Sequence, residues 1–307
     1  MIFQITYMSD QYKVKGYLGL PTGFGWTADA LQDAIESICG AADLPVTVVA
    51  EDARPSRART ARRSPAAAAD GAADLPAAVV ARDARPAARL PAFMYCRGGV
   101  GGFGRVRPHW VDSFAARGVV AFAPCYRGNE GGEGRDEFGG ADREDVHAAF
   151  RLLQALPFVD AGRISLMGFS RGSINAALTA AAYPETHRLV IWSGVADLAR
   201  TYEERVDLRR TLKRILNGSP TKRPDAYQER SPIRLAERIR CPALVIHGTN
   251  DVQVDVGHGL SLYETFKRLG TRAELHLYQG YGHLLPYVAH EAAIDRMFDW
   301  IERAGDG

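Results

Sequence analysis

From residue 90 onward, short apolar runs alternate with segments in which apolar residues recur every three or four positions. The apolar runs are LPAFMYC (90–96), GVVAFAP (118–124), ISLMG (164–168), RLVIWSG (188–194), CPALVIHG (241–248) and AELHLYQ (273–279). Runs without polar alternation are typical of strands buried on both faces of a parallel sheet. The pattern predicts an α/β fold, with a mostly parallel, doubly wound sheet and helices on both faces.

The first 22 residues show a different period. Phe3, Ile5 and Tyr7 alternate with other residues, and a second alternating run follows the turn signal Ser9-Asp10. Two alternating runs joined by a short turn predict an antiparallel hairpin over residues 1–22, added to the edge of the sheet.

Residues 23–89 are rich in alanine, arginine and proline and contain an internal repeat. AADLPVTVVAEDARPS at 41–56 is echoed by AADLPAAVVARDARPA at 72–87. Two copies are too few for a solenoid, which needs at least about three repeats. One helix is predicted from Thr27 to Cys39, with Thr27 as its N-cap. The remainder, including the basic run 57–63, is predicted to be a solvated and partly disordered insertion ahead of a catalytic core over 90–307.

Composition and charge narrow the class of protein. The chain has 307 residues, of which 46% are hydrophobic and 24% charged, and its net charge is only +2. This balance favours neither a nucleic-acid nor a membrane partner. The four cysteines are far apart and form no C-x-x-C pair, so we expect no metal and no cofactor. No signal-peptide pattern is present at the N-terminus, which makes the cytoplasm the expected location.

Candidate chemistry begins at Gly168-Phe169-Ser170-Arg171-Gly172, where an apolar strand meets a predicted helix. G-x-S-x-G between a strand and a helix is the pattern of a nucleophile elbow, a tight turn that exposes a serine. The helix that follows directs its free N–H groups and positive dipole end toward that serine. Ser170 is therefore the candidate nucleophile, although a plain turn residue would also fit the local pattern.

An elbow serine requires an acid and a base further along the chain, in that order. Asp251 follows one predicted strand and His283 follows the next. The carboxyl ends of parallel strands meet at one edge, so Ser170, Asp251 and His283 are predicted to form a triad there. Asp255 is a competitor for the acid, and Asp251 could instead cap the following helix. His247 lies within a strand and is interpreted as a packed core histidine.

The chemistry also needs donors for an oxyanion. The backbone N–H of Arg171, directly after the candidate nucleophile, is one expected donor. The glycine-rich loop after the strand 90–96 supplies the other, from Gly98 or Gly99, where a missing side chain lets a carbonyl oxygen approach. A phosphate-binding loop is the alternative interpretation of these glycines, but G-x-x-x-x-G-K-[ST] is absent.

These residues resemble the catalytic domain of the prolyl oligopeptidase family of serine peptidases, within the α/β-hydrolase superfamily. The resemblance extends from about Leu90 to Trp300 and includes the hairpin. It is carried by YCRGG, APCYRGNEGGEGRDEFGGADREDV, GFSRGS, YQERSPIRLAERIRCPALVIHGTNDVQV and GYGH. It differs at Arg97, where many relatives have histidine, and at Ser173, where a second glycine is common.

The resemblance implies the α/β-hydrolase fold, with Ser170, Asp251 and His283 as the catalytic triad. It also implies hydrolysis of a peptide or aminoacyl bond through an acyl-enzyme. We expect no propeller domain before the core and a small helical cap over 197–240, which makes a carboxylesterase on small acyl esters the alternative. A non-catalytic binding protein on the same fold is a further alternative. The expected partner is a small molecule or short peptide, and the sequence does not specify an oligomeric state.

Overall fold

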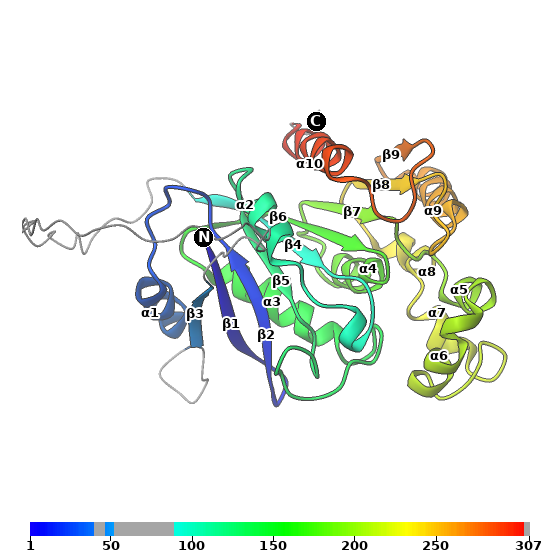
Figure 1. Cartoon of the computed structure of the whole chain (residues 1–307), viewed down its shortest axis with the longest axis horizontal. Helices are drawn as coiled ribbons and strands as arrows, with labels where there is room; N and C mark the ends of the chain where they lie inside the picture. The colour runs from blue at the N-terminus through cyan, green and yellow to red at the C-terminus, as the bar shows by residue number, and fades with distance from the viewer. Residues whose placement is uncertain (40–46, 52–88, 304–307) are drawn as a thin grey trace, which may run out of the picture.

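The computed structural model describes residues 1–39, 47–51 and 89–303. Within these residues, nine strands form one sheet in the order β3-β1-β2-β5-β4-β6-β7-β8-β9 (Figure 1). They are β1 (Ile2–Ser9), β2 (Tyr12–Gly19), β3 (Thr47–Glu51), β4 (Leu90–Cys96), β5 (Val120–Pro124), β6 (Val159–Phe169), β7 (Arg188–Trp192), β8 (Ala243–Gly248) and β9 (Ala273–Tyr278). Pairing is parallel from β5 through β4 to β9 and antiparallel among β3, β1, β2 and β5. The predicted mostly parallel sheet with an N-terminal antiparallel hairpin is confirmed.

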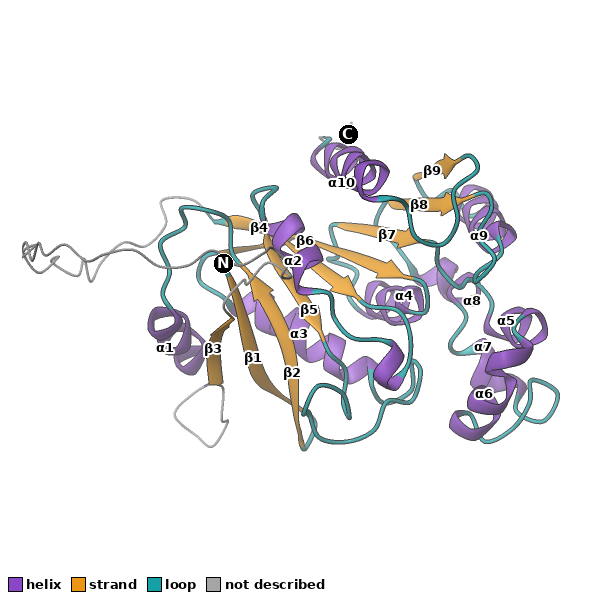
Figure 2. Cartoon of the chain, in the orientation of Figure 1, coloured by secondary structure: helices purple, strands orange, loops and turns teal. Residues whose placement is uncertain are grey.

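Helices cover both faces of the sheet (Figure 2). They are α1 (Ala28–Cys39), α2 (Pro108–Ala115), α3 (Arg143–Ala155), α4 (Gly172–Ala182), α5 (Leu198–Glu204), α6 (Arg209–Ile215), α7 (Pro224–Gln228), α8 (Pro232–Leu235), α9 (Val256–Arg268) and α10 (Tyr287–Glu302). Apolar residues of α1, α3, α4 and α9 join the core on one face, and those of α2 and α10 join the core on the other. No described helix is both long enough and apolar enough to cross a membrane.

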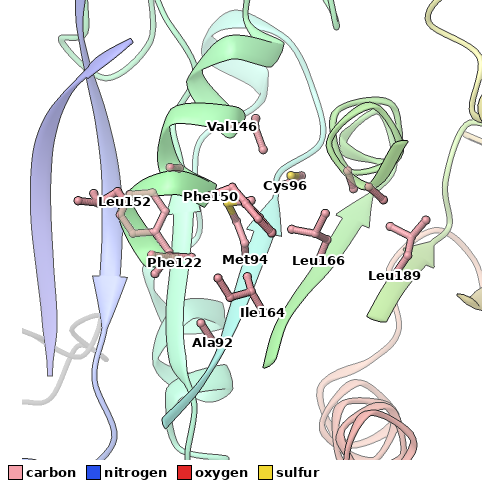
Figure 3. Close-up of a cluster of buried hydrophobic side chains, with 14 of the residues drawn as sticks. Ala92, Met94, Cys96, Phe122, Val146, Phe150, Leu152, Ile164, Leu166 and Leu189 are labelled. Carbon is pink, nitrogen blue, oxygen red and sulfur yellow. The ribbon is translucent and has the colours of Figure 1, made fainter. Parts of the chain in front are cut away.

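Strand β4 shows why the central strands are continuous apolar runs. Ala92, Met94 and Cys96 belong to the core beneath α3 and α4, where Figure 3 shows Met94 among side chains of the neighbouring strands. Phe93 and Tyr95 point to the opposite face and join the core beneath α2 and α10. Because successive side chains of a strand alternate between faces, a strand buried on both faces needs apolar residues at every position.

The carboxyl ends of the parallel strands lead to the loops that carry the candidate chemistry. Residues 97–104 follow β4, Ser170 follows β6, and the loops after β8 and β9 begin at Thr249 and Gln279. The segment 197–240 contains the short helices α5 to α8 and lies at this side of the sheet (Figure 1). The fold thus gathers the sites predicted from four separate parts of the sequence.

Two described parts of the segment 23–89 belong to the fold. Helix α1 buries Leu31 and Ile35 completely in the main core, and β3 adds to the sheet beside β1. Thr27 caps the helix as expected, accepting the Ala30 N–H at 3.2 Å. The helix predicted from Thr27 to Cys39 is thus present, whereas the composition of the surrounding segment obscured the edge strand. Residues 40–46 and 52–88, with the second repeat copy, lie outside the described residues.

Replacing Ile35 with alanine is therefore expected to destabilise the fold. A buried isoleucine truncated to alanine costs about 2–5 kcal/mol through lost burial and the cavity left behind. Denaturant unfolding of Ile35→Ala measures this loss. Asp33→Ala on the exposed face of the same helix is the control and should change stability by less than about 0.5 kcal/mol. Equal stability of both variants would show that α1 does not contribute to the core.

Candidate active site

Ser170 occupies the turn between β6 and α4 in a strained backbone conformation. Its φ is 55°, in the left-handed region that non-glycine residues rarely adopt. The surrounding backbone holds this geometry. The Ser170 N–H donates to the Trp192 carbonyl at 3.0 Å, and the Ser170 carbonyl accepts the N–H groups of Ser173 and Val195. Strain at a residue held this firmly is typical of a functional turn.

Close packing explains two of the glycines around Ser170. A Cβ atom on Gly172 would lie 1.9 Å from the Cys96 carbonyl oxygen, so the helix could not begin this close to β4. A Cβ on Gly98 would lie 2.8 Å from the Ser170 Cβ. Gly98 therefore lies directly against the candidate nucleophile, as an oxyanion donor must.

Asp251 and His283 meet at the edge where the sequence predicted them. The His283 Nδ1 lies 2.7 Å from the Asp251 Oδ2, and both side chains are buried. The other carboxylate oxygen, Oδ1, accepts the backbone N–H groups of Gln253 at 2.8 Å and Val254 at 3.0 Å. These bonds leave Oδ2 for the histidine and fix the orientation of the imidazole.

Asp255, the other candidate for the acid, lies at the start of a helix. It is the N-cap of α9, where its carboxylate accepts the Gly257 N–H at 2.9 Å. It also forms an ion pair with Arg200 at 2.7 Å. Helix capping and a surface ion pair account for Asp255, whereas Asp251 is the carboxylate that contacts a loop histidine.

His247 is a core histidine, as predicted, but it also lies against the candidate acid. Its Nε2 is 2.9 Å from the Val254 carbonyl oxygen and 3.5 Å from the Asp251 Oδ2. Burial by itself raises the pKa of Asp251, but hydrogen bonds from His247 and His283 outweigh burial and hold that pKa below its ordinary value. The carboxylate is therefore ionised beside His283. The position of His247 within a strand gave no signal of this contact.

The side chain of Arg171 has a role that the sequence did not predict. It is almost fully buried, and it contacts both oxygens of Asp136 at 2.9 and 2.7 Å and Asp142 at 2.8 Å. Burial alone lowers the pKa of this guanidinium, but the two carboxylates raise it above its ordinary value. Its Nη1 also donates to the Gly99 carbonyl at 3.0 Å. Arg171 thus ties the elbow to the glycine loop that is expected to supply an oxyanion donor.

A cavity of about 570 Å³ lies over these groups and contains Ser170 and His283 in its wall. Part of its lining is an apolar cluster that packs with α5, α6 and α7 and includes Val100, Phe138, Val195, Leu208 and Val254. The lining also includes Tyr95, Arg105, Arg107, Phe169 and Leu284, and the charged pair Arg205 and Asp207. Among the described contacts no hydrogen bond joins Ser170 to His283, a looseness common in unliganded sites. The arrangement can hold a small acyl compound next to a serine and a histidine.

Elsewhere in the described part of the chain, no group of three or more histidine, cysteine, aspartate or glutamate side chains is arranged to hold a metal ion. Cys96, Cys125 and Cys241 are free and buried. Burial raises the pKa of the Cys96 and Cys241 thiols to about 12. These cysteines are therefore protonated packing residues at neutral pH.

Comparison with known proteins identifies relatives over most of the chain. Residues 105–306 match the model of the prolyl oligopeptidase family. An uncharacterised peptidase of Bacillus subtilis, YtmA, is 43% identical over 211 residues, covering 68% of this chain and 82% of that protein.

Solved structures show the same fold at lower identity. Dipeptidyl peptidase 4 of Porphyromonas gingivalis matches 97% of the chain with a TM-score of 0.63 and 16% identity. A puromycin-hydrolysing peptidase of Mycobacterium tuberculosis matches 69% with a TM-score of 0.62 and 23% identity. The chain spans 35% and 34% of these two structures. The predicted α/β-hydrolase fold and family resemblance are confirmed.

Proposed function

The chain belongs to the prolyl oligopeptidase family of serine peptidases, and we propose that it cleaves acyl bonds through a Ser170–His283–Asp251 triad and an acyl-enzyme. The observation that carries this proposal is the buried 2.7 Å contact between His283 and Asp251, beside a cavity that also contains Ser170. Asp251 holds the His283 Nδ1 protonated, which leaves the Nε2 lone pair free to accept a proton. This is the arrangement that activates a serine hydroxyl.

The reaction proceeds in two halves. Ser170 Oγ attacks the carbonyl carbon of the substrate while His283 Nε2 takes the hydroxyl proton. The tetrahedral intermediate collapses as the bond to the leaving group breaks and His283 returns the proton to the leaving nitrogen or oxygen. A water molecule, deprotonated by His283, then attacks the acyl-enzyme and releases the acid, which restores Ser170.

The negative oxygen of the intermediate needs preorganised donors. In this proposal the backbone N–H of Arg171 and that of Gly98 or Gly99 fill this role. Arg171 lies at the N-terminus of α4, and Gly98 packs against Ser170. The Arg171 side chain forms ion pairs with Asp136 and Asp142 and a hydrogen bond to the Gly99 carbonyl. These contacts hold the two backbone donors in position relative to each other.

We propose a short peptide or aminoacyl compound as the substrate. The supporting observations are the family, the peptidase YtmA as a relative at 43% identity, and a cavity with room for a small acyl group. Small carboxylic esters follow the same chemical path. Their alkoxide leaving group departs more readily than the unprotonated nitrogen of an amide. Activity on chromogenic aminoacyl amides alongside matched esters would separate the two classes.

Covalent labelling tests the nucleophile directly. A fluorophosphonate probe is expected to add once per chain, and peptide mapping should place the adduct on Ser170. The reagent requires an activated serine, so a heat-denatured sample is the control and should not react. Absence of labelling in the folded protein, or an adduct on another residue, would contradict the proposed mechanism and favour a binding protein on this fold.

A further inference from the structure

We propose that the cavity binds a carboxylate on the leaving-group side of the scissile bond through Arg107. The preferred substrates are then short acyl-peptides whose leaving group is one or two residues long and ends in a free C-terminal carboxylate. This inference rests on the proposed function, since it assigns a leaving group to the reaction of Ser170 and His283.

A series of ring contacts connects Arg107 to His283. The Arg107 guanidinium lies over the Trp110 ring at 5.0 Å, Trp110 contacts Phe169 at 5.1 Å, and Phe169 contacts His283 at 4.9 Å. Other lining residues, including Phe138 and Val195, pack in a separate apolar cluster with the cap helices. We call the lining that is connected from Arg107 through Phe169 to His283 the cationic half. The lining that packs with the cap helices, which also carries the ion pair of Arg205 with Asp207, is called the apolar half.

The arginines of the cavity wall differ in whether their guanidiniums already pair with carboxylates. Arg171 forms ion pairs with Asp136 and Asp142, and Arg205 makes a two-bond contact with Asp207 at 2.9 and 2.7 Å. By contrast, the side chains of Arg105 and Arg107 make no ion pair or hydrogen bond with any described residue. Two cations without counter-ions in the wall of a candidate active site create a positive potential that favours an anionic ligand.

Two carboxylates in this region have partners other than Arg105 and Arg107. Glu130 accepts the backbone N–H of Val106 at 3.0 Å, and Glu291 pairs with Arg117 at 3.0 Å. Arg107 is half-buried, whereas Arg105 on the same loop is exposed. A half-buried guanidinium positioned over an indole ring retains the planar fork of donors that suits two-bond recognition of a carboxylate. Arg107 is therefore the principal residue of the site, with Arg105 adding charge at its rim.

Tyr95 provides a second and independent observation. It lines the same half of the cavity, is only 2% exposed, and its hydroxyl makes no hydrogen bond with any described residue. Burial raises the pKa of this hydroxyl, and the nearby Arg107 opposes the rise only in part, so the group remains a donor. A hydroxyl of a cavity-lining residue that has no partner among the described residues is open to a ligand atom. A carboxylate oxygen held by Arg107 would satisfy it.

The position of the cationic half decides which part of the substrate it binds. His283 delivers its proton to the leaving group, so the leaving group lies next to His283. The apolar half is then left for the acyl side. Since an extended residue spans about 3.3–3.6 Å, one or two residues can connect the scissile nitrogen to a carboxylate near Arg107.

The test compares N-blocked tripeptides with a free C-terminal acid and the same peptides as C-terminal amides. The wild-type enzyme should hydrolyse the acid with the higher kcat/KM. Arg107→Gln should lower kcat/KM for the acid by about 10- to 100-fold, the loss expected for hydrogen bonds to a charged group. The value for the amide should stay within about twofold. Arg240→Gln removes the same charge outside the cavity and should leave both values unchanged.

Several outcomes would overturn the inference. Equal kcat/KM for acid and amide in the wild type, or equal loss of both in Arg107→Gln, would remove the carboxylate site. If Arg107→Gln loses activity on a hemisuccinate acyl ester but not on the peptide acid, the anion binds on the acyl side instead. If Arg107→Gln does not fold, two other experiments test the carboxylate site. One is hydrolysis of both peptides by Arg107→Lys, and the other is calorimetric binding of the acid and the amide to Ser170→Ala. Fluorophosphonate labelling and neutral-ester hydrolysis are unaffected by these outcomes, so failure of this site is distinguishable from failure of the proposed function.

Discussion

Ser170→Ala is expected to lower kcat by on the order of 10⁶, as removal of the nucleophile does in serine proteases. The remaining residues can still bind the substrate and stabilise an oxyanion, but no covalent intermediate can form. Steady-state hydrolysis of an activated ester by the purified variant measures the loss. Combining Ser170→Ala with His283→Ala should cost little more than either change alone, because the two side chains act as a unit.

Ser193 offers a matched control for this substitution. It follows the neighbouring strand β7, is buried and has a positive φ of 44°, and its hydroxyl has no hydrogen-bond partner among the described residues. Ser193→Ala therefore removes a similar hydroxyl from a similar backbone turn and should retain activity. Additive losses in the Ser170/His283 double variant, or equal losses in the two serine variants, would show that the roles are misassigned.

Asp251→Asn is expected to lower kcat by about 10⁴, the effect of the corresponding change in a serine protease triad. The structure explains why. Asp251 Oδ1 accepts the N–H groups of Gln253 and Val254, so an asparagine at this position must keep its oxygen there. Its amide nitrogen then faces His283 and donates to Nδ1. That contact favours the tautomer with hydrogen on Nε2, which cannot take a proton from Ser170. Hydrolysis rates of the folded variant measure the loss.

Asp255→Asn is the control for the acid. Asparagine is also a good N-cap, so this variant should fold, remain active, and lose only the exposed pair with Arg200, worth about 0–1 kcal/mol. Thermal unfolding and ester hydrolysis of both variants are the measurements. An active Asp251→Asn enzyme beside an inactive Asp255→Asn enzyme would reverse the assignment of the acid.

Much of the fold could be predicted because its signals are local. The continuous apolar runs of β4, β6, β7 and β8 indicated a sheet covered on both faces, and the alternation in the first 20 residues indicated a hairpin. Strand β3 and the packing of α1 were not predicted. Five residues, TVVAE, carry too little periodicity to stand out within an alanine- and arginine-rich segment, and only pairing with β1 makes them a strand.

Residue types and their order along the chain determined the core of the candidate site. Ser170 was predicted from a strand, a tight turn and a helix, whose steric requirements are met within five residues. Asp251 and His283 were predicted because parallel strands deliver their following loops to one edge of the sheet. The sequence also determined the glycines around Ser170, although only the structure shows that Gly98 and Gly172 are needed for close packing.

Tertiary structure alone decided the contacts between residues far apart in the chain. It placed His247 against Asp251, joined Arg171 to Asp136 and Asp142, and set Arg107 over Trp110. None of these contacts follows from a local period or a turn rule. They depend on strand order and on which loops meet above the sheet. Local backbone sterics and side-chain periodicity are encoded in neighbouring residues, whereas charge pairing and cavity shape are set by distant segments that only packing brings together.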